Sequence, residues 1–230
     1  MMPKKLSKQP TFPGSIPTST LCPAPPILSD GLPLPRAVIF DLDYTLWPFW
    51  VDTHVCAPLR AANAERSAAV DRIGETFTFY TEIPSVLHGL ARAGVKIGVA
   101  SRTHAPDLAR ELLKLLLVPP ASSVLDDGSN AGGTEGGGST SVSANKKDKP
   151  KRAIEFFDAG LEIYPSSKIQ HFKALGKKTS IPHNEMLFFD DESRNRDTES
   201  LGVTMWLVRD GVSWNEVVDG IKEWRRRKGV

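Results

Sequence analysis

The stretch AVIFDLDYT, residues 37–45, contains the pattern that decides the fold. Its first part, Ala37–Leu42, is an apolar run of strand length that ends in acidic residues. Because side chains alternate along a strand, Asp41 and Asp43 lie on one face and Leu42 on the other. Two carboxylates that share a face repel each other unless a positive charge lies between them. The stretch therefore predicts a buried strand that delivers two acids to a charged site.

Outward from this strand, short apolar runs alternate with helix-like stretches. The further strands predicted are Val95–Ala100, Leu161–Tyr164, Met186–Phe189 and Val203–Val208. The helices predicted are Val86–Ala93, ended by Gly94; Leu108–Leu117, ended by Pro119 and Pro120; Lys168–Leu175; and a last helix that opens with Ser213 and Glu216 and runs to Lys228. Runs apolar on both faces predict an α/β fold with a three-layer, Rossmann-like parallel sheet and helices on both faces.

Polar residues follow several of these strands where each strand ends. These are Asp41 and Asp43, Ser101 and Arg102, and Asp190 and Asp191. In open parallel sheets, ligands bind beyond the carboxyl ends of the strands. Two acidic pairs at that edge favour a hard divalent cation with oxygen ligands. An isolated Asp-x-Asp is more often a turn and helix cap, but the second acidic pair disfavours that interpretation here.

Three residues near this edge have a functional and an ordinary interpretation. Ser101 either caps the next helix or holds a phosphate oxygen through its hydroxyl and backbone N–H. Arg102 is either a surface charge or a fork for phosphate. Lys168 stands just before a predicted helix, and its position alone favours a surface charge because the chain has many lysines.

Composition limits the partners and the compartment. The 230 residues are 40% apolar and 24% charged, as in ordinary soluble proteins, and the net charge of +2 gives no argument for nucleic acid or a membrane surface. Two cysteines favour a reducing compartment, and no apolar run approaches the roughly 20 residues of a membrane helix, so we expect a cytoplasmic monomer. Lys4, Lys5 and Lys8 weakly resemble an organelle transit peptide, although seven prolines interrupt that stretch.

The chain divides into a tail and one domain. Residues 1–35 are rich in Pro, Ser and Thr and predict a disordered tail, and residues 36–230 form the domain. Residues 126–150 are dominated by Gly, Ser, Thr, Asn and Lys, which predicts a low-complexity surface insert within the domain.

Four motifs resemble one known family. FDLDYT fits the DxDxT signature of haloacid-dehalogenase-type phosphatases, and VIFDLDYTLWPFWVDTHV resembles the eukaryotic magnesium-dependent phosphatase family almost throughout. VASRT resembles the second motif of that family, and IYPSSKIQHF and FFDDESRN resemble its later motifs. The resemblance covers residues 36–101 and 161–218. It implies a haloacid-dehalogenase-like phosphomonoester hydrolase that uses Mg²⁺.

The resemblance also implies a role for each matching residue. Asp41 attacks phosphorus and forms an aspartyl-phosphate, while Asp43 is the general acid and base, with a pKa raised partly by the charge of Asp41. The backbone carbonyl of Asp43 contacts the metal. The metal shell also includes Asp41 and Asp191, with Asp190 behind them or in place of Asp191. Ser101, Arg102 and Lys168 hold or balance the phosphate, and Trp50 is either a substrate-contacting aromatic or plain core.

Other functions fit these residues less well. A receiver domain would carry its acidic pair near the first strand, a dehalogenase would not need Asp43, and a non-catalytic phosphate-binding module would be expected to lose Asp41 or Asp43. The gap from Asp43 to Ser101 is too short for a large cap domain. We therefore expect an open site for phosphotyrosine in a protein, or for sugar or glycated-amine phosphates.

Overall fold

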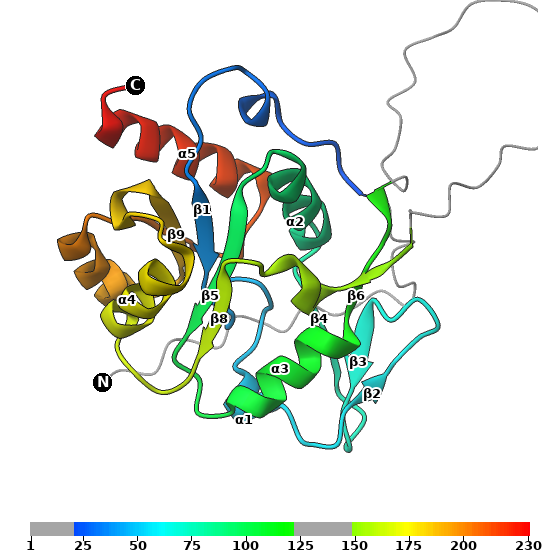
Figure 1. Cartoon of the computed structure of the whole chain (residues 1–230). Helices are drawn as coiled ribbons and strands as arrows, with labels where there is room; N and C mark the ends of the chain where they lie inside the picture. Colours follow the sequence, from blue (N-terminus) through cyan, green and yellow to red (C-terminus); the bar gives the residue numbers. More distant parts are fainter. Residues whose placement is uncertain (1–20, 122–148) are drawn as a thin grey trace, which may run out of the picture.

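The computed structural model describes residues 21–121 and 149–230. Its centre is a five-stranded sheet in the order β10-β9-β1-β5-β8, in which every neighbouring pair is parallel (Figure 1). The strands are β1 (Ala37–Phe40), β5 (Lys96–Ser101), β8 (Gly160–Ile163), β9 (Met186–Asp190) and β10 (Thr204–Leu207). The structure confirms the predicted α/β fold with a central parallel sheet.

Helices cover both faces of this sheet. The α-helices are α1 (Val51–His54), α2 (Ile83–Arg92), α3 (Pro106–Leu115), α4 (Lys168–Thr179) and α5 (Trp214–Lys228). Short 3-10 segments are η1 (Pro26–Leu28), η3 (Ala153–Phe156), η4 (His183–Glu185) and η5 (Ser193–Leu201). As predicted, α5 begins after Ser213, whose hydroxyl accepts from the N–H of Glu216. Helix α3 ends at Leu115, two residues before the predicted end at Leu117.

Alternation along the strands divides the core into two layers. Val38 and Phe40 of β1 pack in one cluster with residues of α2, α3 and α5. Ile39, between them, packs on the opposite face with Phe172 and Phe188. The rings of Phe172 and Phe188 meet edge to face, with centroids 4.9 Å apart. This two-sided burial explains why the strands read as continuous apolar runs.

A small antiparallel sheet was not predicted. It consists of β2 (Arg60–Ala61), β3 (Ala68–Val70) and β4 (Thr76–Thr78), between α1 and α2. Strands of two or three residues are too short to show a period of two in the sequence. No large cap domain interrupts this part of the described chain, in agreement with the short gap before Ser101.

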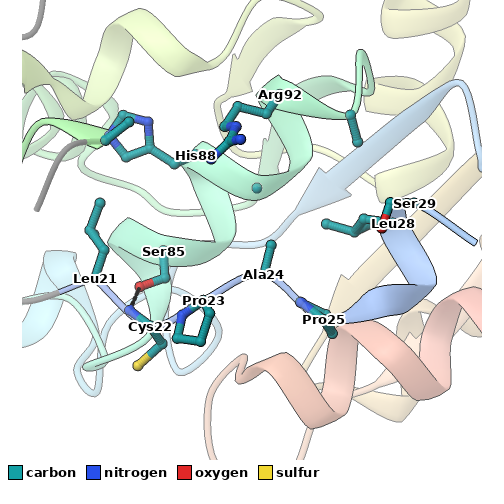
Figure 2. A pocket seen from close by; sticks show the side chains of 13 residues that line it. Leu21, Cys22, Pro23, Ala24, Pro25, Leu28, Ser29, Ser85, His88 and Arg92 are labelled. Carbon is teal, nitrogen blue, oxygen red and sulfur yellow. Dashed lines mark hydrogen bonds between the residues drawn. The ribbon is translucent and has the colours of Figure 1, made fainter. Parts of the chain in front are cut away.

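The second part of the predicted tail, residues 21–35, packs on the domain instead of being disordered. Arg225 of α5 donates to Asp30 at 2.7 and 2.9 Å and to the carbonyl of Pro33 at 2.9 Å. Nearer the start, the N–H of Cys22 donates to Ser85 Oγ of α2 at 2.8 Å, beside a cavity of about 380 Å³ (Figure 2). We call residues 21–35 the strap. Residues 1–20 lie outside the described residues, so tail disorder there stays a prediction.

Most of the predicted insert, residues 126–148, also lies outside the described residues. Its neighbours form a two-stranded ribbon of β6 (Leu117–Val118) and β7 (Lys151–Arg152), which pair antiparallel and so bring the two ends of the insert together. No helix within residues 21–121 and 149–230 combines the length and apolar character needed to cross a bilayer.

Candidate active site

The loop after β1 carries the two acids of the first motif. The N–H of Asp41 donates to the carbonyl of Phe189 at 2.9 Å, so this residue still belongs to the sheet ladder. The chain then turns, and the carbonyl of Leu42 accepts from the next residues of the loop. Tyr44 takes a left-handed conformation in that turn, with a φ of 54°. Asp43 thus leaves the sheet while Asp41 stays at its edge.

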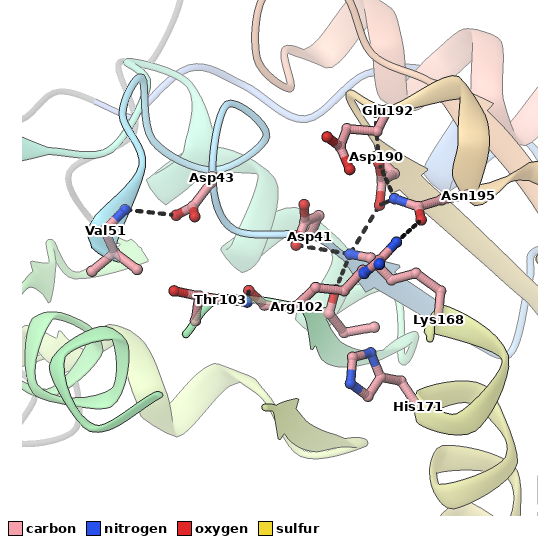
Figure 3. Close-up of polar contacts among 12 residues, drawn as sticks. Asp41, Asp43, Val51, Arg102, Thr103, Lys168, His171, Asp190, Glu192 and Asn195 are labelled. Atoms are coloured by element: carbon pink, nitrogen blue, oxygen red, sulfur yellow. Dashed lines mark hydrogen bonds and ion pairs between the residues drawn. The ribbon is translucent and has the colours of Figure 1, made fainter. Parts of the chain in front are cut away.

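Lys168 lies at the centre of the site (Figure 3). Its Nζ is 2.8 Å from Asp41 Oδ1 and 2.9 Å from Asp190 Oδ2, and it donates to the carbonyl of Ala100. Burial lowers the pKa of Lys168, but the carboxylates of Asp41 and Asp190 outweigh burial and raise it. With only 1% of its surface exposed, Lys168 is an internal counter-ion and not the surface charge that its position alone favours.

Several hydrogen-bond donors contact the carboxylate of Asp190. Asn195 donates from Nδ2 to both of its oxygens, at 2.9 and 2.8 Å, and the N–H of Glu192 donates at 2.7 Å. With Lys168 added, four donor contacts surround this fully buried carboxylate. Most of its lone pairs are therefore engaged by the protein. This supports the prediction that Asp191 is the metal ligand and that Asp190 stands behind it.

A group of three carboxylates could hold a metal ion. Asp41, Asp190 and Asp191 each offer an oxygen, and these oxygens lie within 4.8 Å of one another. Apart from its ion pair with Lys168, the buried Oδ1 of Asp41 has no hydrogen-bond partner among the described residues. Carboxylate oxygens are the ligands that Mg²⁺ prefers. The donor set fits Mg²⁺, while the predicted contact with the Asp43 carbonyl stays a prediction.

The protonation of Asp41 depends on this environment. Burial raises the pKa of Asp41 to about 8; the Lys168 ammonium opposes the shift, and the carboxylates of Asp190 and Asp43 add to it. One ammonium shared by two buried carboxylates leaves an excess of negative charge. Further positive charge at this point would favour the ionised form of Asp41.

Asp43 has a separate environment. Its Oδ1 accepts from Trp47 Nε1 at 2.7 Å and from the N–H of Val51 at 3.2 Å. Burial raises the pKa of Asp43 to about 6 although both hydrogen bonds oppose the shift. The raised pKa agrees with the expectation for a general acid. The neighbouring carboxylate of Asp52 also raises this pKa, a contribution that the sequence did not predict.

The predicted phosphate-binding residues Ser101 and Arg102 come from the end of β5, the strand next to β1. Ser101 ends β5 and is 1% exposed; its Oγ accepts from the N–H of Thr103 at 3.4 Å. Helix α3 begins later, with Ala105 as its N-cap, so Ser101 does not cap it. Arg102 is half-buried, and its Nη1 donates to Asn195 Oδ1 at 3.4 Å. Both residues therefore stand at the carboxyl edge that holds Asp41.

Aromatic rings mark the mouth of the site beside Asp43. Trp50 is 40% exposed, so core packing does not explain it. Its ring meets Tyr44 edge to face, with centroids 5.0 Å apart, and stacks on His54 at 5.7 Å. Trp50 therefore presents a flat apolar surface to solvent a few residues after Asp43.

Sequence reasoning missed two polar residues of this site. Asn195 donates to Asp190, five residues earlier in the chain. The FFDDESRN motif contains both residues, but the sequence does not show that the chain turns back to bring them together. His171 is buried three residues after Lys168 in the IYPSSKIQHF motif. The helical spacing of Lys168 and His171 was a signal that could have placed both on one face.

Comparison with known proteins shows which family this chain matches. Residues 33–227 match the acid phosphatase family. A HAD-like hydrolase superfamily protein of Schizosaccharomyces pombe is 39% identical over 76% of this chain and 86% of its own. Magnesium-dependent phosphatase 1 of Homo sapiens is 35% identical over 84% of this chain and 89% of its own length. A putative magnesium-dependent phosphatase of Saccharomyces cerevisiae is 35% identical over 78% of this chain and 92% of its own length.

Proposed function

The chain belongs to the acid phosphatase family and is a magnesium-dependent phosphatase, and we propose that it hydrolyses phosphomonoesters through an aspartyl-phosphate on Asp41. One observation carries the proposal. The carboxylate of Asp41 lies at the carboxyl edge of the sheet, against Lys168 and within reach of Asp190 and Asp191, while a second acid with a raised pKa follows two residues later.

In the first half-reaction, a carboxylate oxygen of Asp41 attacks phosphorus. The bond between phosphorus and the ester oxygen breaks, and the proton of Asp43 moves to that leaving oxygen as alcohol departs. A carboxyl with a pKa near 6 retains a proton far better than a free aspartic acid at neutral pH. The burial of Asp43 and the neighbouring Asp52 therefore prepare it to act as the acid.

In the second half-reaction, water attacks the phosphorus of the aspartyl-phosphate. Asp43, now ionised, accepts a proton from that water; the bond between phosphorus and the Asp41 oxygen breaks, the intact Asp41 carboxylate is regenerated, and inorganic phosphate leaves with the oxygen of the water. Ser101 and Arg102 hold the phosphate oxygens, and Lys168 balances the charge between Asp41 and the phosphoryl group. When bound by Asp41 and Asp191, Mg²⁺ supplies positive charge that favours the ionised form of Asp41 and offsets the charge of the phosphoryl group.

The aromatic residues near Asp43 favour an aryl phosphate as substrate, and phosphotyrosine is the aryl phosphate found in proteins. Trp50 and Tyr44 offer flat apolar surface beside Asp43, where the leaving group departs. The small β2–β4 sheet leaves room for an extended substrate better than a large cap would. Sugar or glycated-amine phosphates need polar groups for their hydroxyls, and we infer that they are the poorer substrates.

A substrate panel tests this proposal. Purified full-length protein should hydrolyse p-nitrophenyl phosphate and a phosphotyrosine peptide with Mg²⁺ and lose activity in excess chelator. Trp50→Leu should raise KM for both aryl esters and leave a sugar phosphate unaffected, with Leu32→Ala, an exposed apolar position on the strap, as the matched control. Full activity without divalent cations contradicts the metal assignment. Equal losses with aryl and sugar phosphates contradict the aryl preference.

We also propose that the protein acts as a cytoplasmic monomer. Cys22 and Cys56 are free thiols, which a reducing compartment favours. Sedimentation at several concentrations and imaging of a C-terminal fluorescent fusion test these two statements. A concentration-dependent dimer or an organelle pattern contradicts them.

A further inference from the structure

His171 is a buried imidazole that the proposed reaction leaves without a role. It belongs to α4, three residues after Lys168, and none of its surface is exposed. Figure 3 shows its ring on the side of the site where the side chains of Lys168 and Arg102 lie. Nothing in the transfer of the phosphoryl group itself requires an imidazole there.

The contacts of the ring fix its tautomer. Nε2 of His171 lies 3.0 Å from the carbonyl oxygen of Tyr164, and because a carbonyl only accepts, Nε2 carries the hydrogen. The Tyr164 ring packs edge-on against the imidazole, with centroids 4.4 Å apart. Burial, then the charge of Lys168, lowers the pKa of His171 to about 4, and the charge of Arg102 adds to this shift. At neutral pH the ring is neutral, and Nδ1 is a bare acceptor.

Nδ1 of His171 is buried and has no hydrogen-bond donor within residues 21–121 and 149–230. Buried polar atoms of this kind rarely stay unpaired, so a donor is expected in the working enzyme. Lys168 is poorly placed to supply it, since three oxygens already surround its ammonium. Arg102 has five N–H groups, and the hydrogen bond that it donates to Asn195 is long, at 3.4 Å.

We propose that His171 is a positioning residue that holds the Arg102 guanidinium on the phosphate subsite. With phosphate bound, Arg102 donates to the phosphate oxygens and, from another N–H of the same fork, to Nδ1 of His171. A phosphate dianion offers only acceptors and does not pair with a bare nitrogen, whereas a guanidinium can donate to both. The inference rests on the proposed function in one respect, namely that Arg102 binds phosphate.

Binding of inorganic phosphate in the presence of Mg²⁺, measured by calorimetry, tests this arrangement without turnover. His171→Gln keeps a donor near the Nε2 position and removes the acceptor at Nδ1; it should weaken phosphate binding about tenfold. His171→Asn keeps an acceptor near the Nδ1 position and should bind phosphate more tightly than His171→Gln. In an Arg102→Ala background, His171→Gln should change the affinity less than about twofold. Additive losses of His171→Gln and Arg102→Ala overturn the proposal, as does equal weakening by Gln and Asn.

A spectroscopic readout on the wild-type chain keeps the test valid if a His171 variant folds poorly. The ¹⁵N resonance of His171 Nδ1 should start at the value of a bare imidazole nitrogen and move toward that of a hydrogen-bonded acceptor as phosphate is added. The shift should disappear in Arg102→Ala. An Nδ1 resonance that ignores phosphate overturns the inference, even where the wild-type enzyme hydrolyses phosphate esters. Absence of any Mg²⁺-dependent hydrolysis would instead contradict the proposed function.

Discussion

Replacing Lys168 by methionine should lower the free energy of unfolding, because Lys168 offsets the repulsion between the buried carboxylates of Asp41 and Asp190. Methionine fills a similar volume without charge, so the buried carboxylates of Asp41 and Asp190 lose their ammonium partner. Removing one partner of a buried ion pair costs about 3–5 kcal/mol. Asp190 keeps its donors from Asn195 and Glu192, which places the expected loss near the lower end, at about 3 kcal/mol.

Urea unfolding in excess chelator measures this loss. With a slope of about 2 kcal/mol per molar urea, the midpoint of Lys168→Met should fall by about 1.5 M. The matched control is Lys96→Met. Lys96 also pairs with an aspartate, Asp158, at 3.0 Å, but both side chains are about half exposed, and the loss there should stay below about 1 kcal/mol.

The loss should also depend on pH in one direction. Without Lys168, the folded-state pKa of Asp41 rises further above its unfolded value, because the ammonium that opposes the shift is gone. A carboxyl whose folded pKa is raised is favourable to folding below its unfolded pKa, and that contribution is lost as pH rises through the folded pKa. Because Asp41 already has a pKa of about 8 in the wild type, the gap between Lys168→Met and the wild type should widen as pH rises through about 8. Equal losses for Lys168→Met and Lys96→Met, or a gap that narrows with rising pH, would refute the assignment of Lys168 as internal counter-ion.

Three further predictions follow from the same site and from the insert. Because burial raises the pKa of Asp43 to about 6, kcat/KM for alkyl phosphates should fall as pH rises above about 6, as the protonated acid is lost; a profile that is flat on both sides of that pH contradicts its role. Since Asp190 is already surrounded by donors, Asp191→Asn should need more Mg²⁺ for half-maximal activity than Asp190→Asn, and the reverse order would move the ligand to Asp190. Deleting residues 128–147 should leave the melting temperature and turnover nearly unchanged, because β6 and β7 join the ends of the insert and loop length costs only about 0.6 kcal/mol per doubling; a collapse of either quantity contradicts this.

The sequence predicted the central sheet because its strands are buried on both faces. Such strands read as unbroken apolar runs, and the acids that follow them, such as Asp41 and Asp190, interrupt the runs at the edge where the site forms. The first strand and its two acids could thus be placed without any tertiary information.

The parts that were missed depend on contacts between distant residues. The strap is held through Arg225 and Asp30, 195 positions apart, and a composition rich in proline gave no sign of this bond. The β2–β4 sheet is too short to show a strand period. The environment of Asp43 also includes Asp52, which α1 brings close and whose charge adds to the raised pKa, so the spacing of Asp41 and Asp43 shows only part of that environment.

The central claim is that Asp41 is the nucleophile, and trapping the phosphoryl group on it is the most direct test. In Asp43→Asn the acid that should activate water is gone, so the intermediate should accumulate with a good leaving group such as p-nitrophenol. Rapid acid quench after mixing with p-nitrophenyl phosphate and Mg²⁺, followed by mass spectrometry of the peptide that contains residue 41, measures it. We predict a phosphate adduct on Asp41 in Asp43→Asn and no adduct or turnover in Asp41→Asn. Turnover by Asp41→Asn comparable to the wild type would contradict the account.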